Sequence, residues 1–198
     1  VSELIGNEKL LYVEPQHKDK FLKKMWELSG AVREQQEVTI TYRRTDGVQV
    51  QRTVQPVGIM FSEFYFYLAG FIVPKEKEKL KFEIENDPFP TIYRIDRINS
   101  FTVTETHFAV PYSKRFEEGE FRKRIQFMYG GHLQRLRFYF KGSCYEYILD
   151  RLPTAKVVQE DEKGTLIEAE VFGKGIDIWL KSQGELIEVI SRQEIPVN

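Results

Sequence analysis

FYLAG at residues 66–70 and YRIDRI at residues 93–98 are the two stretches of this chain that decide its fold. In both, apolar side chains alternate with tyrosine or arginine, as they do in a β-strand whose successive side chains point to opposite faces. Such a strand buries one face and leaves the other available to a ligand. A face that carries guanidinium and phenol groups suits an anion or a nucleic-acid backbone. The pattern therefore predicts a binding module rather than a catalyst.

The residues before FYLAG predict a β-hairpin. Residues 37–44 alternate apolar and polar side chains. Asp46-Gly47 then gives a tight-turn signal, because glycine accepts a positive φ without steric cost. Alternation resumes at Val48 in a return strand, which is expected to end at Pro56.

Three further strands are predicted after the hairpin. A third strand starts at Val57 and contains FYLAG, and YRIDRI forms the fourth. Asn99-Ser100 is expected to turn the chain into a fifth strand over residues 101–106. Five short strands with tight turns predict a small, strongly bent β-barrel. An apolar stripe at helical spacing predicts a helix over residues 17–36, ahead of this barrel.

The second half of the chain has a different pattern. Alternating runs predict strands, and periodic runs that end near proline or glycine predict helices. The predicted order is strand 133–141, helix 143–152, strand 155–159, strand 165–172, helix 176–183 and strand 186–191. This β-α-β-β-α-β order is typical of a ferredoxin-like arrangement.

The predicted class is therefore α+β, with two folded units. We expect a linker helix region (residues 1–36), a small β-barrel (37–110), a connector (111–131) and a ferredoxin-like unit (132–198). Gly130-Gly131 marks the last boundary.

Composition limits the possible functions. The formal net charge of −1 argues against a protein that coats nucleic acid without specificity, although it leaves room for a local basic patch. Cys144 is the only cysteine, so no disulfide within the chain is expected, and we expect its thiol to be buried. Neither a secretory signal nor a run of roughly 18 apolar residues is present, so we expect no membrane association and a cytoplasmic location.

These residues resemble the WYL domain of bacterial transcriptional regulators. The resemblance rests on the strand at 37–44, Pro56, FYLAG and YRIDRI in this order and spacing. In addition, residues 28–34 are similar to the helix that precedes that domain, and residues 178–190 resemble the C-terminal extension that often follows it. Phe66 replaces the tryptophan of the motif, and Thr91 stands where the family often has a basic residue.

The resemblance implies a fold and a function. WYL domains resemble Sm-type small barrels and act as effector-sensing modules, with nucleotides or single-stranded nucleic acid as ligands in some members. They usually follow a winged helix-turn-helix. No such pattern precedes the barrel here, so we expect DNA to be read by an upstream helix-turn-helix that this chain lacks. The expected protein is a homodimer that binds a small anionic ligand or nucleic acid. The alternatives are a stand-alone binder of nucleotides or single-stranded nucleic acid and, less favoured, a hydrolase or transferase.

The candidate ligand-binding residues are arginines and tyrosines of the barrel, because a guanidinium binds phosphate bidentately and a tyrosine can stack on a base. They are Tyr67, Arg97, Arg94, Tyr42 and Arg43. Arg94 and Arg97 should lie on opposite faces of one strand, because their positions differ by an odd number. Arg94 shares a face with Asp96, so an internal ion pair is an alternative role for Arg94.

A second candidate surface lies on the strand at 133–141, where Arg135, Arg137 and Tyr139 share one face. This face could bind single-stranded nucleic acid, or it could be an ordinary solvated face or a subunit interface. The residues of the chain show no metal-site spacing and no nucleophile–base pair, so we expect no catalytic residue, metal or cofactor. Gly173-Lys174-Gly175 precedes a helix but lacks the rest of a phosphate loop.

Overall fold

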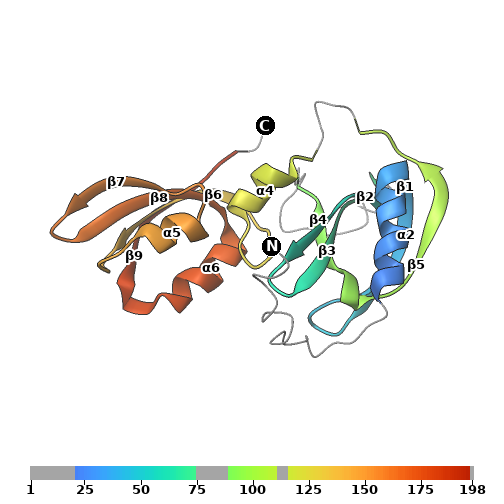
Figure 1. Cartoon of the computed structure of the whole chain (residues 1–198), viewed down its shortest axis with the longest axis horizontal. Coiled ribbons are helices and arrows are strands. Elements are labelled where there is room, and N and C mark those ends of the chain that lie inside the picture. Colours follow the sequence, from blue (N-terminus) through green and yellow to red (C-terminus); the bar gives the residue numbers. More distant parts are fainter. Residues whose placement is uncertain (1–20, 75–88, 111–115, 197–198) are drawn as a thin grey trace, which may run out of the picture.

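The computed structural model describes residues 21–74, 89–110 and 116–196, which form two antiparallel sheets with few helices (Figure 1). The predicted α+β class is confirmed. The elements of the first half are α2 (Phe21–Glu34), β1 (Gln36–Arg43), β2 (Gln49–Ser62), β3 (Tyr65–Ile72), β4 (Thr91–Arg94), the 3-10 helix η1 (Ile95–Arg97) and β5 (Ile98–His107). Those of the second half are α4 (Glu118–Arg124), β6 (Leu133–Phe140), α5 (Glu146–Arg151), β7 (Lys156–Asp161), β8 (Gly164–Phe172), α6 (Gly173–Ser182), the 3-10 helix η3 (Gly184–Leu186) and β9 (Ile187–Glu194).

The first sheet has the strand order β4-β3-β2-β1-β5. The predicted hairpin at Asp46-Gly47 joins β1 to β2, and Gly47 adopts a φ of 83° there. No pairing between the edge strands β4 and β5 is found in the described part of the chain, so the predicted barrel does not appear as a closed one.

β2 is longer than its sequence predicts. It continues through Pro56 to Ser62 and pairs with β3 along that length, so the prediction that the return strand ends at Pro56 is wrong. The register shifts between Pro56 and Gly58. A bulge lets a sheet accept proline, which has no N–H to donate, and the strand bends there instead of ending.

YRIDRI is not a single strand. β4 ends at Arg94, residues 95–97 form η1, and β5 begins at Ile98 and runs through Asn99-Ser100. The tight η1 turn carries the chain from one edge of the sheet to the other, because β4 pairs with β3 whereas β5 pairs with β1. Ile95 and Ile98 are both fully buried, and their spacing of three fits a 3-10 turn rather than a strand.

The second sheet has the order β7-β8-β6-β9, with antiparallel pairing throughout. The predicted β-α-β-β-α-β element order is therefore observed. α5 and α6 both pack on the face of β6 that carries Leu136, Phe138 and Phe140. The predicted domain boundaries and the ferredoxin-like designation remain predictions.

Two clusters of buried side chains lie on opposite faces of the first sheet. Leu28 and Ala31 of α2 pack with Leu68 on one face. Tyr67 and Ala69 belong to the other cluster. Here sheet residues meet Phe121 of α4 and Phe172 of β8, which the second half of the chain supplies. FYLAG is thus buried on both faces, and this second cluster, which we call the inter-sheet cluster, joins the two sheets.

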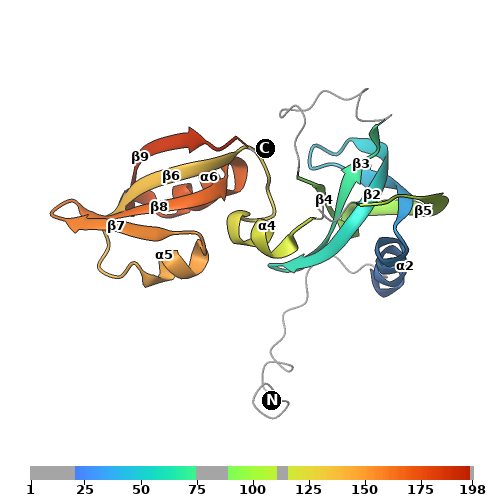
Figure 2. The same cartoon turned by 90° about the horizontal axis from the view of Figure 1, so that it is seen from above.

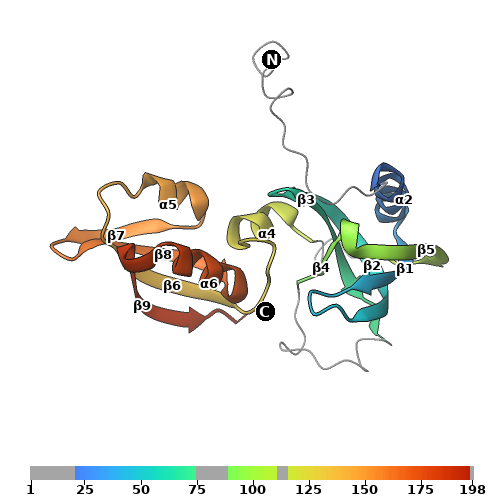
Figure 3. The same ribbon diagram turned by 90° about the horizontal axis from the view of Figure 1, so that it is seen from below.

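Polar contacts also join the two sheets through α4, which lies between them in all three views (Figures 1–3). Arg124 of α4 donates to Glu120 at 2.8 Å and to Glu170 of β8 at 3.4 Å. Arg122 donates to the carbonyl oxygen of Phe61 in β2 at 3.2 Å. The connector is therefore bonded to both sheets.

Cys144 is exposed, so the prediction of a buried thiol is wrong. It lies before α5 in the short loop after β6, outside the core of the second sheet. Its thiol donates to the Glu146 carboxylate at 2.9 Å, which raises the pKa of the thiol.

Candidate functional site

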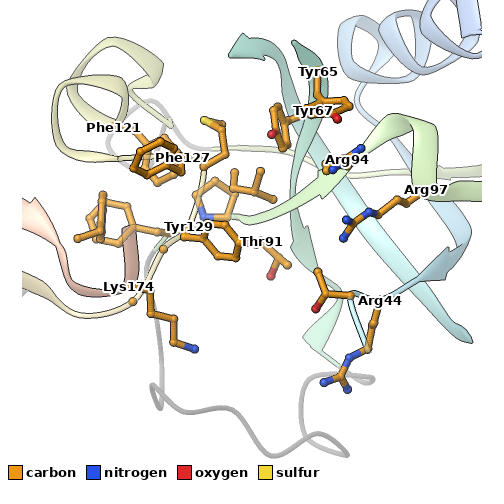
Figure 4. Close-up of a pocket in the computed structure, with 18 of the residues that line it drawn as sticks. Arg44, Tyr65, Tyr67, Thr91, Arg94, Arg97, Phe121, Phe127, Tyr129 and Lys174 are labelled. Atoms are coloured by element: carbon orange, nitrogen blue, oxygen red, sulfur yellow. The ribbon is translucent and has the colours of Figure 1, made fainter. Parts of the chain in front are cut away.

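A cavity of about 750 Å³ lies where the first sheet, the connector and the start of α6 meet (Figure 4). Most of its side chains are aromatic, aliphatic or cationic, and its one acidic side chain among the described residues, Glu63, pairs with Arg151 at 3.4 Å. The aromatic and cationic side chains include Arg44, Tyr65, Tyr67, Arg94, Arg97, Phe121, Phe127, Tyr129 and Lys174. Part of the cavity wall belongs to the inter-sheet cluster, because Tyr67, Phe121, Met128 and Phe172 belong to both.

Arg94 is held firmly beside the cavity. It lies opposite Tyr67 in the β3–β4 pairing, and its guanidinium stacks over the Tyr65 ring at 3.5 Å from the ring centroid. Two of its nitrogens donate to the Asp96 carboxylate, at 3.0 and 2.5 Å. Burial would lower the pKa of Arg94, but the Asp96 hydrogen bond and charge outweigh it, so the pKa is raised. The ion pair considered from the sequence is present, and it balances the charge of Arg94.

Arg97 also faces the cavity, but its setting differs. It ends η1 and is partly exposed. No hydrogen bond or ion pair of its side chain is found within residues 21–74, 89–110 and 116–196. Arg94 and Arg97 therefore line the same cavity, and the prediction that they point to opposite faces of one strand is wrong. The reason is η1, which rotates the chain between them.

Tyr67 is 8% exposed, and burial raises the pKa of its phenol although the neighbouring Arg94 opposes that shift. The neutral phenol is therefore favoured in the folded protein. The protonated Tyr67 phenol stabilises the folded protein fully below the unfolded-state pKa of about 10. This stabilisation is lost as the pH rises through the raised folded-state pKa.

We expect the free energy of unfolding to fall more steeply above about pH 10 in the wild type than in Tyr67→Phe, which has no phenol to ionise. Urea unfolding of both proteins at neutral and alkaline pH measures this. Parallel pH profiles would contradict the assigned burial of Tyr67.

The structure brings four of the five sequence-predicted barrel residues to this cavity. Tyr42, Tyr67, Arg94 and Arg97 line it. Arg43 is exposed at the end of β1 and does not line it, because successive side chains of a strand alternate and its neighbours Tyr42 and Arg44 face the cavity instead. Arg44 also forms an ion pair with Asp46 at 3.1 Å.

Sequence reasoning missed the residues that the connector and α6 contribute. Phe127, Tyr129 and Lys174 lie 29 residues or more beyond YRIDRI in the sequence, and no local pattern signals their approach to it. Gly130-Gly131 predicts a boundary after the connector, whereas in the structure the same two glycines also line the cavity.

The second predicted surface carries balanced charges. Arg135 pairs with Glu170 at 3.2 Å and Arg137 with Glu168 at 3.4 Å, both across the β6–β8 pairing. Tyr139 donates its hydroxyl to Asp161 at 2.8 Å. Each of the three residues thus has an acidic partner, as expected of a solvated sheet face, and nucleic-acid binding there stays a prediction.

The backbone amides at the start of α6 have little capacity left for a phosphate. The N–H of Gly173 donates to the His132 carbonyl oxygen at 3.0 Å, and that of Lys174 donates to Gly130 at 3.3 Å. Those two amides would otherwise be among the helix donors available to an anion.

No group of three histidine, cysteine or acidic side chains that could hold a metal ion is found among the described residues. In the same part of the chain, every helix is too short or too polar to cross a membrane.

Residues 24–103 match the family model of the WYL domain. These residues of the chain therefore form a WYL domain, as the sequence resemblance predicts. A WYL domain fits a ligand-sensing regulatory region in general.

The chain is also similar to solved structures, including the following two. One is a CRISPR Cas-related protein, with a TM-score of 0.53 and 13% identity over 86% of this chain and 48% of that protein. The other is proteasome accessory factor B/C (PafBC) of Arthrobacter aurescens, with a TM-score of 0.43 and 14% identity over 90% of this chain and 26% of that one. The chain thus spans less than half the length of either. At these identities the first likeness concerns the fold alone. No curated protein matches the chain.

Proposed function

We propose that this chain is the effector-sensing region of a bacterial transcriptional regulator and that it binds a nucleotide, a short oligonucleotide or another anionic ligand in the cavity. The observation that carries the proposal is Arg97. Its guanidinium lines an aromatic cavity and has no acidic partner among the described residues. A partly buried guanidinium gains from a hydrogen-bonded anion. A ligand phosphate can supply that partner.

The other cavity residues support a ligand with both a charged and a planar part. Arg94 and Arg44 are balanced by Asp96 and Asp46, so they add hydrogen-bond donors with little free charge. The tyrosine and phenylalanine rings offer surfaces on which a base can stack. Such contacts tolerate different bases, so the proposal names a class of ligand rather than one molecule.

The proposal includes a larger architecture. The WYL unit would be a small Sm-like barrel, residues 132–198 a ferredoxin-like extension, and DNA would be bound by a helix-turn-helix upstream. Ligand binding would then favour one orientation of the DNA-binding domain. This requires that the ligand prefer one of two conformational states, because a ligand with equal affinity for both shifts nothing.

We also propose a homodimer. Trp26 on α2 is 81% exposed, and Ile190 on the edge strand β9 is 51% exposed. Apolar side chains with this exposure are suited to contacts between copies. Light scattering coupled to size exclusion measures the mass in solution, and a monomeric mass at high protein concentration would contradict the dimer.

The alternative is a stand-alone binder of single-stranded nucleic acid or nucleotides that uses the same cavity. Both readings predict ligand binding, and they differ in whether a DNA-binding domain precedes Val1 in the natural protein. The sequence of the gene upstream of this region distinguishes them. We propose a binding role rather than catalysis, because no histidine lines the cavity within the described ranges.

A thermal-shift screen with nucleotides and short oligonucleotides tests the proposed function. A ligand that binds only the folded protein stabilises it by about 2.7 kcal/mol at 100 times its Kd. We expect at least one nucleotide or oligonucleotide to raise the Tm, and we expect Arg135→Ala/Arg137→Ala to show the same shift. A flat screen across all probes would contradict ligand sensing. A shift lost only in the double variant would move the site to the second sheet.

A further inference from the structure

The connector contains a strained turn that borders the cavity. Gln126 and Tyr129 form an isolated antiparallel bridge, and the N–H of Tyr129 donates to the Gln126 carbonyl oxygen at 3.1 Å. Between them Phe127 and Met128 have φ values of 51° and 55°. Glycine and asparagine adopt the left-handed backbone conformation readily, whereas phenylalanine and methionine adopt it only at a cost in conformational energy. We call residues 126–129 the connector turn.

Packing on both sides holds the connector turn in this conformation. Met128 is buried in the inter-sheet cluster, whereas Phe127 packs against the core of the second sheet beneath the Arg151 guanidinium. The carbonyl oxygen of Gln126 lies so close to Gly175 of α6 that a Cβ added there would be 2.1 Å away. Surroundings that fix a strained backbone this completely are typical of functional sites.

The connector turn places Tyr129 at the cavity. Tyr129 lines it and is 46% exposed, so its ring is open to a ligand. Lys174, at the start of α6, lines the cavity as well. Figure 4 shows Tyr129 and Lys174 on one side of the cavity and Arg94 and Arg97 on the other. The two sides come from different halves of the chain.

The volume of the cavity indicates the size of its ligand. About 750 Å³ falls within the range of pockets for drug-sized molecules, roughly 300–1,000 Å³. An inorganic phosphate or sulfate bound to Arg97 would leave most of that space and the aromatic side chains unused. A nucleotide has a planar base for the rings and negative charge for the cations.

We infer that the ligand site is composite: Arg97 of the WYL domain binds a phosphate, the ring of Tyr129 stacks on the base, and Lys174 provides a second cationic contact. The inference rests on the proposed function and adds that residues outside the WYL domain determine the affinity. A ligand held in this way spans the two sheets and restrains their relative movement. An inorganic anion cannot make the stacking contact.

Fluorescence anisotropy with the full chain tests the composite site. The probes are a fluorescently labelled mononucleotide and a labelled short oligothymidylate, with inorganic phosphate as competitor. We expect Tyr129→Ala and Lys174→Glu each to weaken binding of the better probe by roughly tenfold or more. Tyr129→Phe keeps the ring, and Lys181→Glu makes the same charge change on an exposed residue of α6 outside the cavity. Both controls should bind within about twofold of the wild type.

Circular dichroism and Tm confirm that each variant is folded before binding is compared. If Arg97→Ala loses affinity while folded Tyr129→Ala and Lys174→Glu bind as the wild type does, the composite site is wrong and the proposed function stands. The composite site is also wrong if inorganic phosphate competes as strongly as the unlabelled nucleotide. If neither probe binds the wild type, or if Arg97→Ala binds both probes unchanged, the proposed function fails as well.

Discussion

Arg97→Ala should bind a nucleotide or oligonucleotide about 30-fold more weakly than the wild type, which corresponds to about 2 kcal/mol for a charge-assisted hydrogen bond. The reason is that Arg97 is the cavity guanidinium without an acidic partner in the described ranges, so its charge is available to a phosphate. Arg97→Glu should have a larger effect, because it also repels the anion. Anisotropy or calorimetric titration measures both affinities.

Arg43→Ala is the matched control for this variant. Arg43 is an exposed arginine at the end of β1 that does not line the cavity, so its loss removes the same charge without removing a cavity contact. Binding by Arg43→Ala should stay within about twofold of the wild type at moderate salt, since exposed charges are screened. Equal losses in the two variants would indicate that the probe responds to the overall field and not to the cavity.

Gly175→Ala should be strongly destabilising. Gly175 is buried in α6, and its added Cβ would lie 2.1 Å from the Gln126 carbonyl oxygen. A backbone atom cannot rotate away as a side chain can, so α6 and the connector turn must separate. We expect a loss of about 3 kcal/mol, the upper part of the range for overpacking. Urea unfolding gives this value from the shift in midpoint.

Gly30→Ala, in helix α2, should instead stabilise the protein. Nothing lies within 4 Å of a Cβ added at Gly30 of α2. Alanine loses less conformational entropy than glycine in a helix interior, so the variant should gain about 0.5–1 kcal/mol. The two substitutions should thus differ in sign. A Gly175→Ala protein as stable as the wild type would contradict the close packing of α6 against the connector turn.

Local patterns predicted much of the fold. Asp46-Gly47 identified the first hairpin because a positive φ leaves a clear signature in sequence, and alternation identified the strands of the second sheet. The strand boundaries were predicted wrongly where the same residue or motif is compatible with two backbone structures. Pro56 can end a strand or sit at a bulge. YRIDRI satisfies a strand period and also places Ile95 and Ile98 three apart, which is the spacing that the 3-10 turn uses.

The candidate site could be predicted only on its WYL side. Tyr67, Arg94 and Arg97 lie in the motifs themselves. The other side depends on tertiary packing, because the connector turn has no glycine or asparagine at its left-handed positions and so gives no turn signal. Lys174 reaches the cavity because Phe172, two residues earlier at the end of β8, packs in the inter-sheet cluster with residues of the first sheet. No residue spacing in the sequence predicts that Lys174 lies near the WYL motifs.

A crystal structure of the chain with its tightest-binding nucleotide or oligonucleotide would show directly whether the cavity is the ligand site. We expect a ligand phosphate within hydrogen-bonding distance of the Arg97 guanidinium and a base inside the cavity beside Tyr129. Ligand density elsewhere, for example over Arg135 and Arg137 on the second sheet, with the cavity occupied by solvent alone, would contradict the proposed site.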